Sequence, residues 1–243
     1  FIKNGYHIYR DYWKNDLENN LNKLIFLARR RIFFYKIFQI SGFNYLKLFF
    51  KRRILRKKTP KRFLIELLRE GEFKHIKSLY NIANDPIITS KVKEYLGKSA
   101  KITGCGLWFS EPKKTKLTKS QLYHLDKPGN YIKVFISLSN INKLNGAFTF
   151  IDSKNTKKFI DKHIKNPDMD STTIDKFNDN YVYSLINKNS EKKFTGSIGD
   201  ILFCDTSNCL HQGSRVEKGY RIMLMLVYAS NTMPNDKASL ILR

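Results

Sequence analysis

The hydrophobic pattern of the chain changes its period at Gly97. Before this glycine, apolar residues recur at helical spacing in three segments: about 17–50, 63–83 and 88–97. After it, the pattern is that of β-strands, in segments 100–110, 131–138, 145–151, 199–204 and 221–229, the last of which is apolar on both faces. A helical part followed by many strands predicts an α+β arrangement around a β-barrel or jelly roll.

We expect a single domain over residues 1–243, because 42% hydrophobic residues and 18 Phe supply a large core. Residues 1–100 are predicted to be mainly helical, and 101–235 to form the core of strands. A Lys-, Asn- and Asp-rich segment at about 152–195 reads as a polar insertion of loop and helix.

Local signals refine this picture. The segment 5–13 has the pattern of a short strand, and Gly42 is expected to end the first helix. Residues 51–62 read as a basic linker, whereas Asn145-Gly146 is typical of a hairpin turn.

The charge of the chain is strongly basic and unevenly distributed. The formal net charge is +24, and residues 1–60 hold 15 Lys and Arg against 3 Asp and Glu, which makes +12. One interpretation is a surface for phosphate, nucleic acid or membrane headgroups. The other, of equal weight, is a generally basic composition without a dedicated partner.

The compartment is predicted from cysteine and from apolar runs. The three cysteines include no C-x-x-C pair, which argues against a disulfide framework or a zinc knuckle and fits a reducing compartment. No apolar run reaches the roughly 18 residues of a membrane span. We therefore expect a soluble, cytoplasmic protein.

His124 and Asp126 stand two positions apart before the strand at 131–138. On an extended chain such residues project from the same face. They form either a surface hydrogen-bonded pair or two-thirds of a metal site. A non-haem Fe(II) site uses two histidines and one carboxylate and leaves three coordination positions open.

A third ligand would come from a distant part of a barrel. His7 and His75 belong to the helical part, and His163 belongs to the polar insertion. His211 stands between two strongly predicted strands and is the best candidate.

Arg221 follows His211 by ten residues, on the last strand. It shares a face with apolar neighbours, namely Met223, Met225 and Val227. A guanidinium on such a face requires an anionic partner. Acidic residues that could supply one are Asp200, Asp205 and Glu217. A carboxylate-bearing cosubstrate would also fit.

These elements resemble the phytanoyl-CoA dioxygenase family of Fe(II)/2-oxoglutarate oxygenases. The resemblance is carried by "YHLD" (123–126), "LNGAFTFI" (144–151) and "GSIGDILFCDTSNCLHQGSRVEKGYRIMLMLVY" (196–228). "GYHIYRDYW" (5–13) is similar to the opening strand of the family. The convincing part covers about 120–230, and the helical N-terminal part matches only in outline.

The resemblance implies a double-stranded β-helix with Fe(II) held by His124, Asp126 and His211. It implies 2-oxoglutarate as cosubstrate, with its distal carboxylate on Arg221 and Arg215 as the less favoured alternative. O2 would complete the reaction, which hydroxylates an unactivated carbon and decarboxylates 2-oxoglutarate to succinate. Because Asp126 is present, the resemblance favours hydroxylation over halogenation.

The substrate is expected to be a small or carrier-linked molecule, and an anionic one is an option. Where the family often has P-G-S-H, this chain has "DSKN" (152–155), which makes phytanoyl-CoA a poor choice of substrate. Nucleic acid is not expected as a partner, and peripheral membrane contact through residues 29–62 stays open. Two rival functions are a jelly-roll protein that binds another metal or a sugar, and a basic module that binds nucleic acid or membrane.

Several strand residues have two interpretations. Aromatic side chains that either line a pocket or, more commonly, fill the core are Trp108, Phe135, Phe148 and Phe150. Cys204 and Cys209 are interpreted as buried core residues rather than metal ligands.

Overall fold

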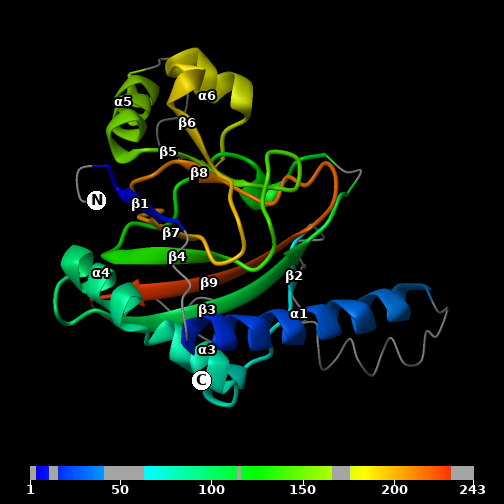
Figure 1. Ribbon diagram of the computed structural model, residues 1–243. Helices are drawn as coiled ribbons and strands as arrows, with labels where there is room; N and C mark the ends of the chain where they lie inside the picture. The colour runs from blue at the N-terminus through cyan, green and yellow to red at the C-terminus, as the bar shows by residue number, and fades with distance from the viewer. Residues whose placement is uncertain (1–3, 11–15, 41–62, 114–115, 166–175, 231–243) are drawn as a thin grey trace.

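The protein is built around two antiparallel β-sheets that face each other as a double-stranded β-helix, or jelly roll (Figure 1). The computed structural model describes residues 4–10, 16–40, 63–113, 116–165 and 176–230. The larger sheet has the order β1-β7-β4-β9-β3-β2, and the smaller sheet has the order β6-β5-β8. The α+β architecture expected from the change of period is confirmed.

The elements have the following bounds. The larger sheet contains β1 (Tyr6–Tyr9), β7 (Ile201–Cys204), β4 (Tyr131–Ser137), β9 (Arg221–Ala229), β3 (Lys101–Ser110) and β2 (Ile65–Glu66). The smaller sheet contains β6 (Glu191–Phe194), β5 (Phe148–Ile151) and β8 (His211–Gln212). The helices are α1 (Asp16–Ile40), α3 (Lys77–Ala83), α4 (Pro86–Leu96), α5 (Ser153–Ile164) and α6 (Asp179–Leu185). Single 3-10 turns span Glu72–Lys74, Lys119–Gln121 and Lys188–Ser190.

The central strands of the larger sheet carry buried apolar residues on both faces. On β4, Ile132, Val134 and Ile136 belong to the core that the sheet shares with α1, α3 and α4. Phe135 points the other way, into the barrel, where its ring lies 4.4 Å from that of Phe148. In Figure 1 helices α1, α3 and α4 cover the outer face of this sheet, while α5 and α6 lie beside the smaller one.

The helix predicted at 88–97 is confirmed as α4, which begins two residues earlier. The Asp85 carboxylate accepts hydrogen bonds from the backbone N–H groups of Ile87 and Ile88, both at 3.0 Å. Pro86 occupies the first turn, where its missing N–H is harmless. Gly97 follows the helix with φ of 90°, a conformation that favours glycine and stops the helix.

The prediction of helix from residue 63 onward is wrong for its first part. Residues 65–66 form β2, which pairs with β3 so that Ile65 is opposite Phe109. The Glu66 carboxylate also accepts the N–H groups of Leu68, at 3.1 Å, and Leu107, at 2.9 Å. Pairing with β3 therefore outweighs the local helical pattern, and helix begins again only at α3.

The hairpin predicted at Asn145-Gly146 is also absent, because β4 and β5, the strands on either side, lie in different sheets. The turn itself is real: Gly146 has φ of 88°. The Asn145 side chain donates to the carbonyl of Asn140 at 2.8 Å and accepts from the N–H of Asn142 at 2.8 Å. These bonds hold a crossover between the sheets rather than a hairpin.

The polar insertion is shorter than predicted. It contains α5 and α6, but residues 191–194 form β6, which pairs with β5 as part of the barrel. The strand expected at 5–13 appears as β1, and the first helix as α1. The predictions for Gly42 and for the linker at 51–62 fall outside the described residues.

None of the helices in the described ranges combines the length and the apolar character of a membrane-crossing segment.

Candidate metal centre

The segment that contains His124 is joined to β8 by paired backbone hydrogen bonds. The N–H of His124 donates to the carbonyl of His211 at 2.9 Å, and the N–H of His211 donates back at 3.0 Å. The N–H of Asp126 donates to the carbonyl of Thr206 at 3.0 Å, which fixes the other end of the H-x-D segment. The backbone thus brings together three residues that the sequence separates.

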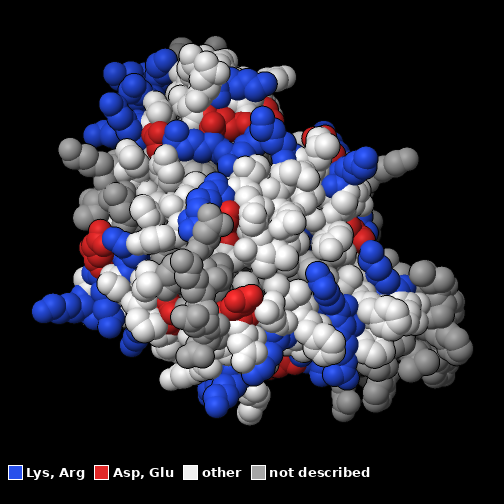
Figure 2. Space-filling view, viewed as in Figure 1, with Lys and Arg blue, Asp and Glu red and all other residues white. Residues whose placement is uncertain are grey.

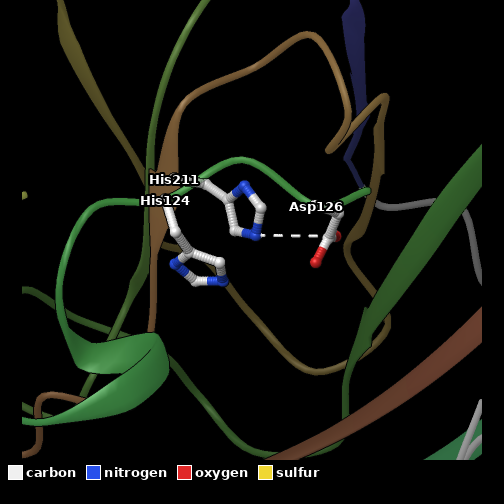
Figure 3. Close-up of side chains that lie close together, drawn as sticks. All are labelled: His124, Asp126 and His211. Carbon is white, nitrogen blue, oxygen red and sulfur yellow. Dashed lines mark ion pairs between the residues drawn. The ribbon is translucent and has the colours of Figure 1, made fainter. Parts of the chain in front are cut away.

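His124, Asp126 and His211 form one cluster inside the barrel (Figure 3). One nitrogen or oxygen atom from each lies within 4.8 Å of the others. The two imidazole rings have centroids 4.3 Å apart, and His211 Nε2 lies 3.7 Å from Asp126 Oδ2. Such a group could hold a metal ion.

Backbone carbonyls orient both imidazoles. His124 Nδ1 lies 2.9 Å from the carbonyl of Leu122, and His211 Nδ1 lies 2.9 Å from the carbonyl of Cys209. Because a carbonyl only accepts, each Nδ1 carries a proton, which leaves Nε2 as the nitrogen that can bind a metal. This is the arrangement in which histidine binds a metal through Nε2.

The protonation states also suit a metal. Burial lowers the pKa of His211 to about 3, so this imidazole is neutral at physiological pH. Burial opposes ionisation of Asp126, but the Lys133 ammonium outweighs it and holds the pKa of Asp126 well below its usual range. A neutral imidazole and a charged carboxylate are the forms that bind metal.

Lys133 is a member of the site that the sequence reasoning missed. Its Nζ lies 2.5 Å from Asp126 Oδ2, the same oxygen that faces His211. The alternation on β4 contains the signal, because Ile132 and Val134 face the outer core and Lys133 therefore faces the barrel interior. The pattern did not identify its partner.

The remaining histidines lie elsewhere, as expected. His7 lies on β1, His75 is exposed after a 3-10 turn, and His163 is buried with Nδ1 2.6 Å from the Tyr181 hydroxyl. Cys204 and Cys209 are buried core residues without a disulfide, as predicted.

Arg221 begins β9 and is only 5% exposed. Its Nη1 donates to the carbonyl of Gly146 at 2.6 Å, and its Nη2 donates to Ser214 Oγ at 2.5 Å. Among the described residues Arg221 Nε has no hydrogen-bond partner, and burial lowers the pKa of Arg221 to about 10.

No carboxylate among the described residues forms an ion pair with Arg221, and this includes the three candidates Asp200, Asp205 and Glu217. Asp200 pairs with Arg10 at 2.6 Å, and Asp205 accepts from the Tyr95 hydroxyl at 2.5 Å. Glu217 forms no ion pair with Arg221 either, within the described part of the chain. The guanidinium is thus a buried cation for which these residues supply no anion.

Two buried serine hydroxyls near Arg221 also lack hydrogen-bond partners among the described residues. Ser110 is directly opposite Arg221 in the pairing of β3 with β9, and Ser137 is opposite Met223 in the pairing of β4 with β9. Both Oγ atoms are buried, and neither has a hydrogen-bond partner in the described part of the chain; the same holds for Arg221 Nε. Buried polar atoms are almost always satisfied, so this inner end of β9 is suited to a polar, anionic ligand.

Arg215, the alternative anion-binding residue, is fully engaged within the protein. Its two terminal nitrogens contact the Asp179 carboxylate at 2.6 and 2.8 Å, and its Nε donates to the carbonyl of Gln121 at 2.6 Å. It therefore has little capacity for a cosubstrate.

The aromatic candidates are mostly core residues. Phe135, Phe148 and Phe150 are buried in the barrel interior, and Trp108 is half-buried on β3. Phe148 has both roles, since its ring stacks on His211 at 5.4 Å between centroids. The Phe148 ring therefore covers one face of the His211 imidazole.

Comparisons with known proteins show the fold alone. No family model matches the chain, and no curated protein matches it in sequence. Among solved structures, the non-haem α-ketoglutarate-dependent epimerase SnoN from nogalamycin biosynthesis is similar, with a TM-score of 0.57 and 13% identity over 93% of this chain and 79% of SnoN. AviO1 from Streptomyces viridochromogenes Tue57 has a TM-score of 0.57 and 13% identity over 96% and 92% of the two chains.

HygX from Streptomyces hygroscopicus, whose structure contains nickel and 2-oxoglutarate, has a TM-score of 0.51 and 11% identity over 93% of this chain and 83% of HygX. A further SnoN structure contains Fe3+, α-ketoglutarate and nogalamycin RO. These structures share the jelly-roll fold with this chain. Membership of the phytanoyl-CoA dioxygenase family stays a prediction, since no family model supports it.

Proposed function

We propose that the protein is an Fe(II)- and 2-oxoglutarate-dependent enzyme that oxidises a small molecule. His124, Asp126 and His211 would hold the iron, and Arg221 would bind the distal carboxylate of 2-oxoglutarate. The observation that carries the proposal is the pairing of two sites in one barrel. One site is a cluster of two imidazoles and an ionised carboxylate, and the other is a buried guanidinium for which the described residues supply no anion.

The donor set supports iron. Two nitrogen donors and one carboxylate oxygen form the set typical of Fe(II) enzymes that use O2, and leave positions for other ligands. When bound, iron with 2-oxoglutarate and O2 supplies an oxidant for C–H bonds, while 2-oxoglutarate becomes succinate and carbon dioxide.

The protein's own residues bind and orient these reactants. The backbone pairing of His124 with His211 fixes the donors, and the Phe148 ring stacks on His211. Arg221 and the hydroxyls of Ser110, Ser137 and Ser214 would receive a carboxylate.

We propose hydroxylation rather than halogenation as the reaction. A halide would need the coordination position that the Asp126 carboxylate would occupy. Similar folds include an epimerase and a carbocyclase, so the same site chemistry serves several outcomes in other proteins. Those proteins act on small molecules, and we propose a small-molecule substrate here. The three free cysteines support a reducing compartment such as the cytoplasm.

A barrel that binds another metal or a sugar is the rival function. It offers no role for Arg221, since a metal site alone needs no buried cation at the end of β9. Equilibrium binding of 2-oxoglutarate distinguishes the two functions.

The test is calorimetric titration of the protein with Ni(II), a redox-inert substitute, and then with 2-oxoglutarate. We expect 2-oxoglutarate to bind only when metal is present in the wild type. His124→Ala should abolish metal binding, whereas His75→Ala, which removes an exposed histidine, should change nothing. Metal binding without any binding of 2-oxoglutarate would favour the rival function.

A further inference from the structure

Helix α1 presents apolar residues on two opposite sides. On the inner side, Leu21, Leu24, Ile25 and Ala28 are buried in the main core. On the outer side, Phe26 is 70% exposed, Phe33 is 61% exposed and Phe34 is 42% exposed. The inner residues already complete the packing of the helix, so the outer phenylalanines have no role in the core.

The outer phenylalanines form a stripe. Seven residues make about two helical turns, so Phe26 and Phe33 lie on the same side of α1. Arg30 lies between them on that side, and its guanidinium is 6.0 Å from the centroid of the Phe34 ring. Lys23 and Arg29 are also exposed. We call Lys23, Phe26, Arg29, Arg30, Phe33 and Phe34 the outer face of α1.

No acidic side chain among the described residues neutralises the cations of the outer face. Within the described residues, Lys23, Arg29 and Arg30 form no ion pair, whereas Arg31 points inward and pairs with Glu72 at 2.6 Å. Residues 19–40 contain no acidic residue. In Figure 2, Lys and Arg side chains lie over the region of α1 with uncharged surface between them.

Aromatic rings interleaved with unpaired cations are suited to the surface of an anionic bilayer. The rings enter the boundary between headgroups and acyl chains, and the cations contact anionic headgroups. A second copy of this chain fits poorly, because it would bring two cationic faces together in a protein of net charge +24. Segment 41–62 fits poorly for the same reason, since it contains nine Lys and Arg and no acidic residue.

Nucleic acid is less suited than lipid. The rings of Phe33 and Phe34 meet edge to face, with 70° between their planes and 5.8 Å between their centroids. They therefore offer no common flat platform for successive bases, which is what single-stranded nucleic acid uses.

We propose that the outer face of α1 docks the protein on anionic lipid bilayers. This goes beyond the proposed enzymatic function and does not depend on it. The rings bury apolar surface in the bilayer, and the cations of α1 provide the preference for anionic lipid.

The experiment is co-sedimentation of the full chain with vesicles of phosphatidylcholine, alone or mixed with phosphatidylserine. Wild type is expected to bind the mixed vesicles and not the neutral ones. The double variant Phe26→Ser, Phe33→Ser should weaken binding by about tenfold for each ring, and Arg30→Gln by about fivefold. Ile87→Ser, which removes a side chain 44% exposed on α4, is the matched control and should bind as wild type does.

Thermal unfolding and Ni(II) binding should be unchanged in all these variants, because the outer face contacts neither the core nor the metal site. If the double serine variant loses stability, Arg29→Gln with Arg30→Gln tests the same face through its cations. Absence of binding to the mixed vesicles overturns the proposal. Vesicle binding that is unchanged in both the phenylalanine and the arginine variants also overturns it. A preference for a single-stranded RNA oligonucleotide over vesicles that depends on the rings overturns it as well.

Discussion

His124 and His211 exchange two backbone hydrogen bonds, of 2.9 and 3.0 Å, so the chain itself sets the separation of their imidazoles. The carbonyls of Leu122 and Cys209 then fix which nitrogen of each ring carries the lone pair. The donor geometry is therefore determined by the fold before any metal binds. Such preorganisation reduces the entropy lost on binding.

Lys133→Met should raise the affinity for divalent metal by about tenfold, because the ammonium holds the Asp126 oxygen that faces His211. The same change should destabilise the metal-free protein by roughly 1–3 kcal/mol, since the carboxylate loses its partner. Metal titration and thermal unfolding with a chelator measure the two effects. Lys127→Met removes an exposed charge nearby and serves as control. A weaker affinity in Lys133→Met would mean that Lys133 instead positions Asp126 for the metal.

Arg221→Lys should weaken 2-oxoglutarate binding by roughly 10- to 100-fold, because an ammonium cannot make the paired hydrogen bonds of a guanidinium. Metal binding should be unchanged, since Arg221 contacts Gly146 and Ser214 rather than the cluster. Titration of the Ni(II)-loaded protein measures both. Arg215→Lys should affect stability through Asp179 and leave 2-oxoglutarate binding intact. Equal loss of metal and cosubstrate in Arg221→Lys would contradict this assignment.

Glu66→Gln should make the protein more stable in alkaline solution. Burial raises the pKa of Glu66 to about 8, although backbone N–H groups favour its charged form. The folded state therefore binds the proton more tightly than the unfolded state, whose pKa is near 4.5. Stability from this group is complete below the unfolded pKa and is lost as pH rises through about 8.

Glutamine keeps the acceptor for Leu68 and Leu107 and removes the charge. The free energies of unfolding of wild type and variant should be similar at acidic pH and differ by a few kcal/mol above pH 8. The upper limit of this difference is about 1.4 kcal/mol for each unit by which the folded and unfolded pKa values of Glu66 differ. Urea unfolding at several pH values measures this. A constant difference across the pH range would show that the charge of Glu66 has no part in it.

The candidate metal centre was predictable because its signals are local. His124 and Asp126 stand beside a strongly alternating strand, and His211 and Arg221 flank another part of the same pattern. The sequence predicts Arg221 to be a cation on an apolar face, and the guanidinium is buried with no anion among the described residues. Lys133 was missed because alternation predicts direction but not the distance to a residue on another segment.

The wrong predictions of secondary structure fall where pairing between distant segments decides the structure. Residues 63–68 are apolar at spacings that a helix shares with an edge strand, and β3 provides a partner that the pattern does not contain. At Gly146 the turn chemistry was predicted correctly, yet the turn alone does not determine which sheet the next strand joins. Three of the four residues of Glu191–Phe194 are charged and not fully buried. Its sequence is therefore similar to the polar segment before it, which is why a loop was predicted there.

The most direct test of the central claim is an anaerobic titration with Fe(II) and then 2-oxoglutarate, followed by visible absorption. Chelation of the iron by the keto acid produces a charge-transfer band. We predict a band in the wild type and in His75→Ala, its loss in His124→Ala, and a higher half-saturating 2-oxoglutarate concentration in Arg221→Lys. A folded wild-type protein that gives no band would contradict the assignment of His124, Asp126, His211 and Arg221.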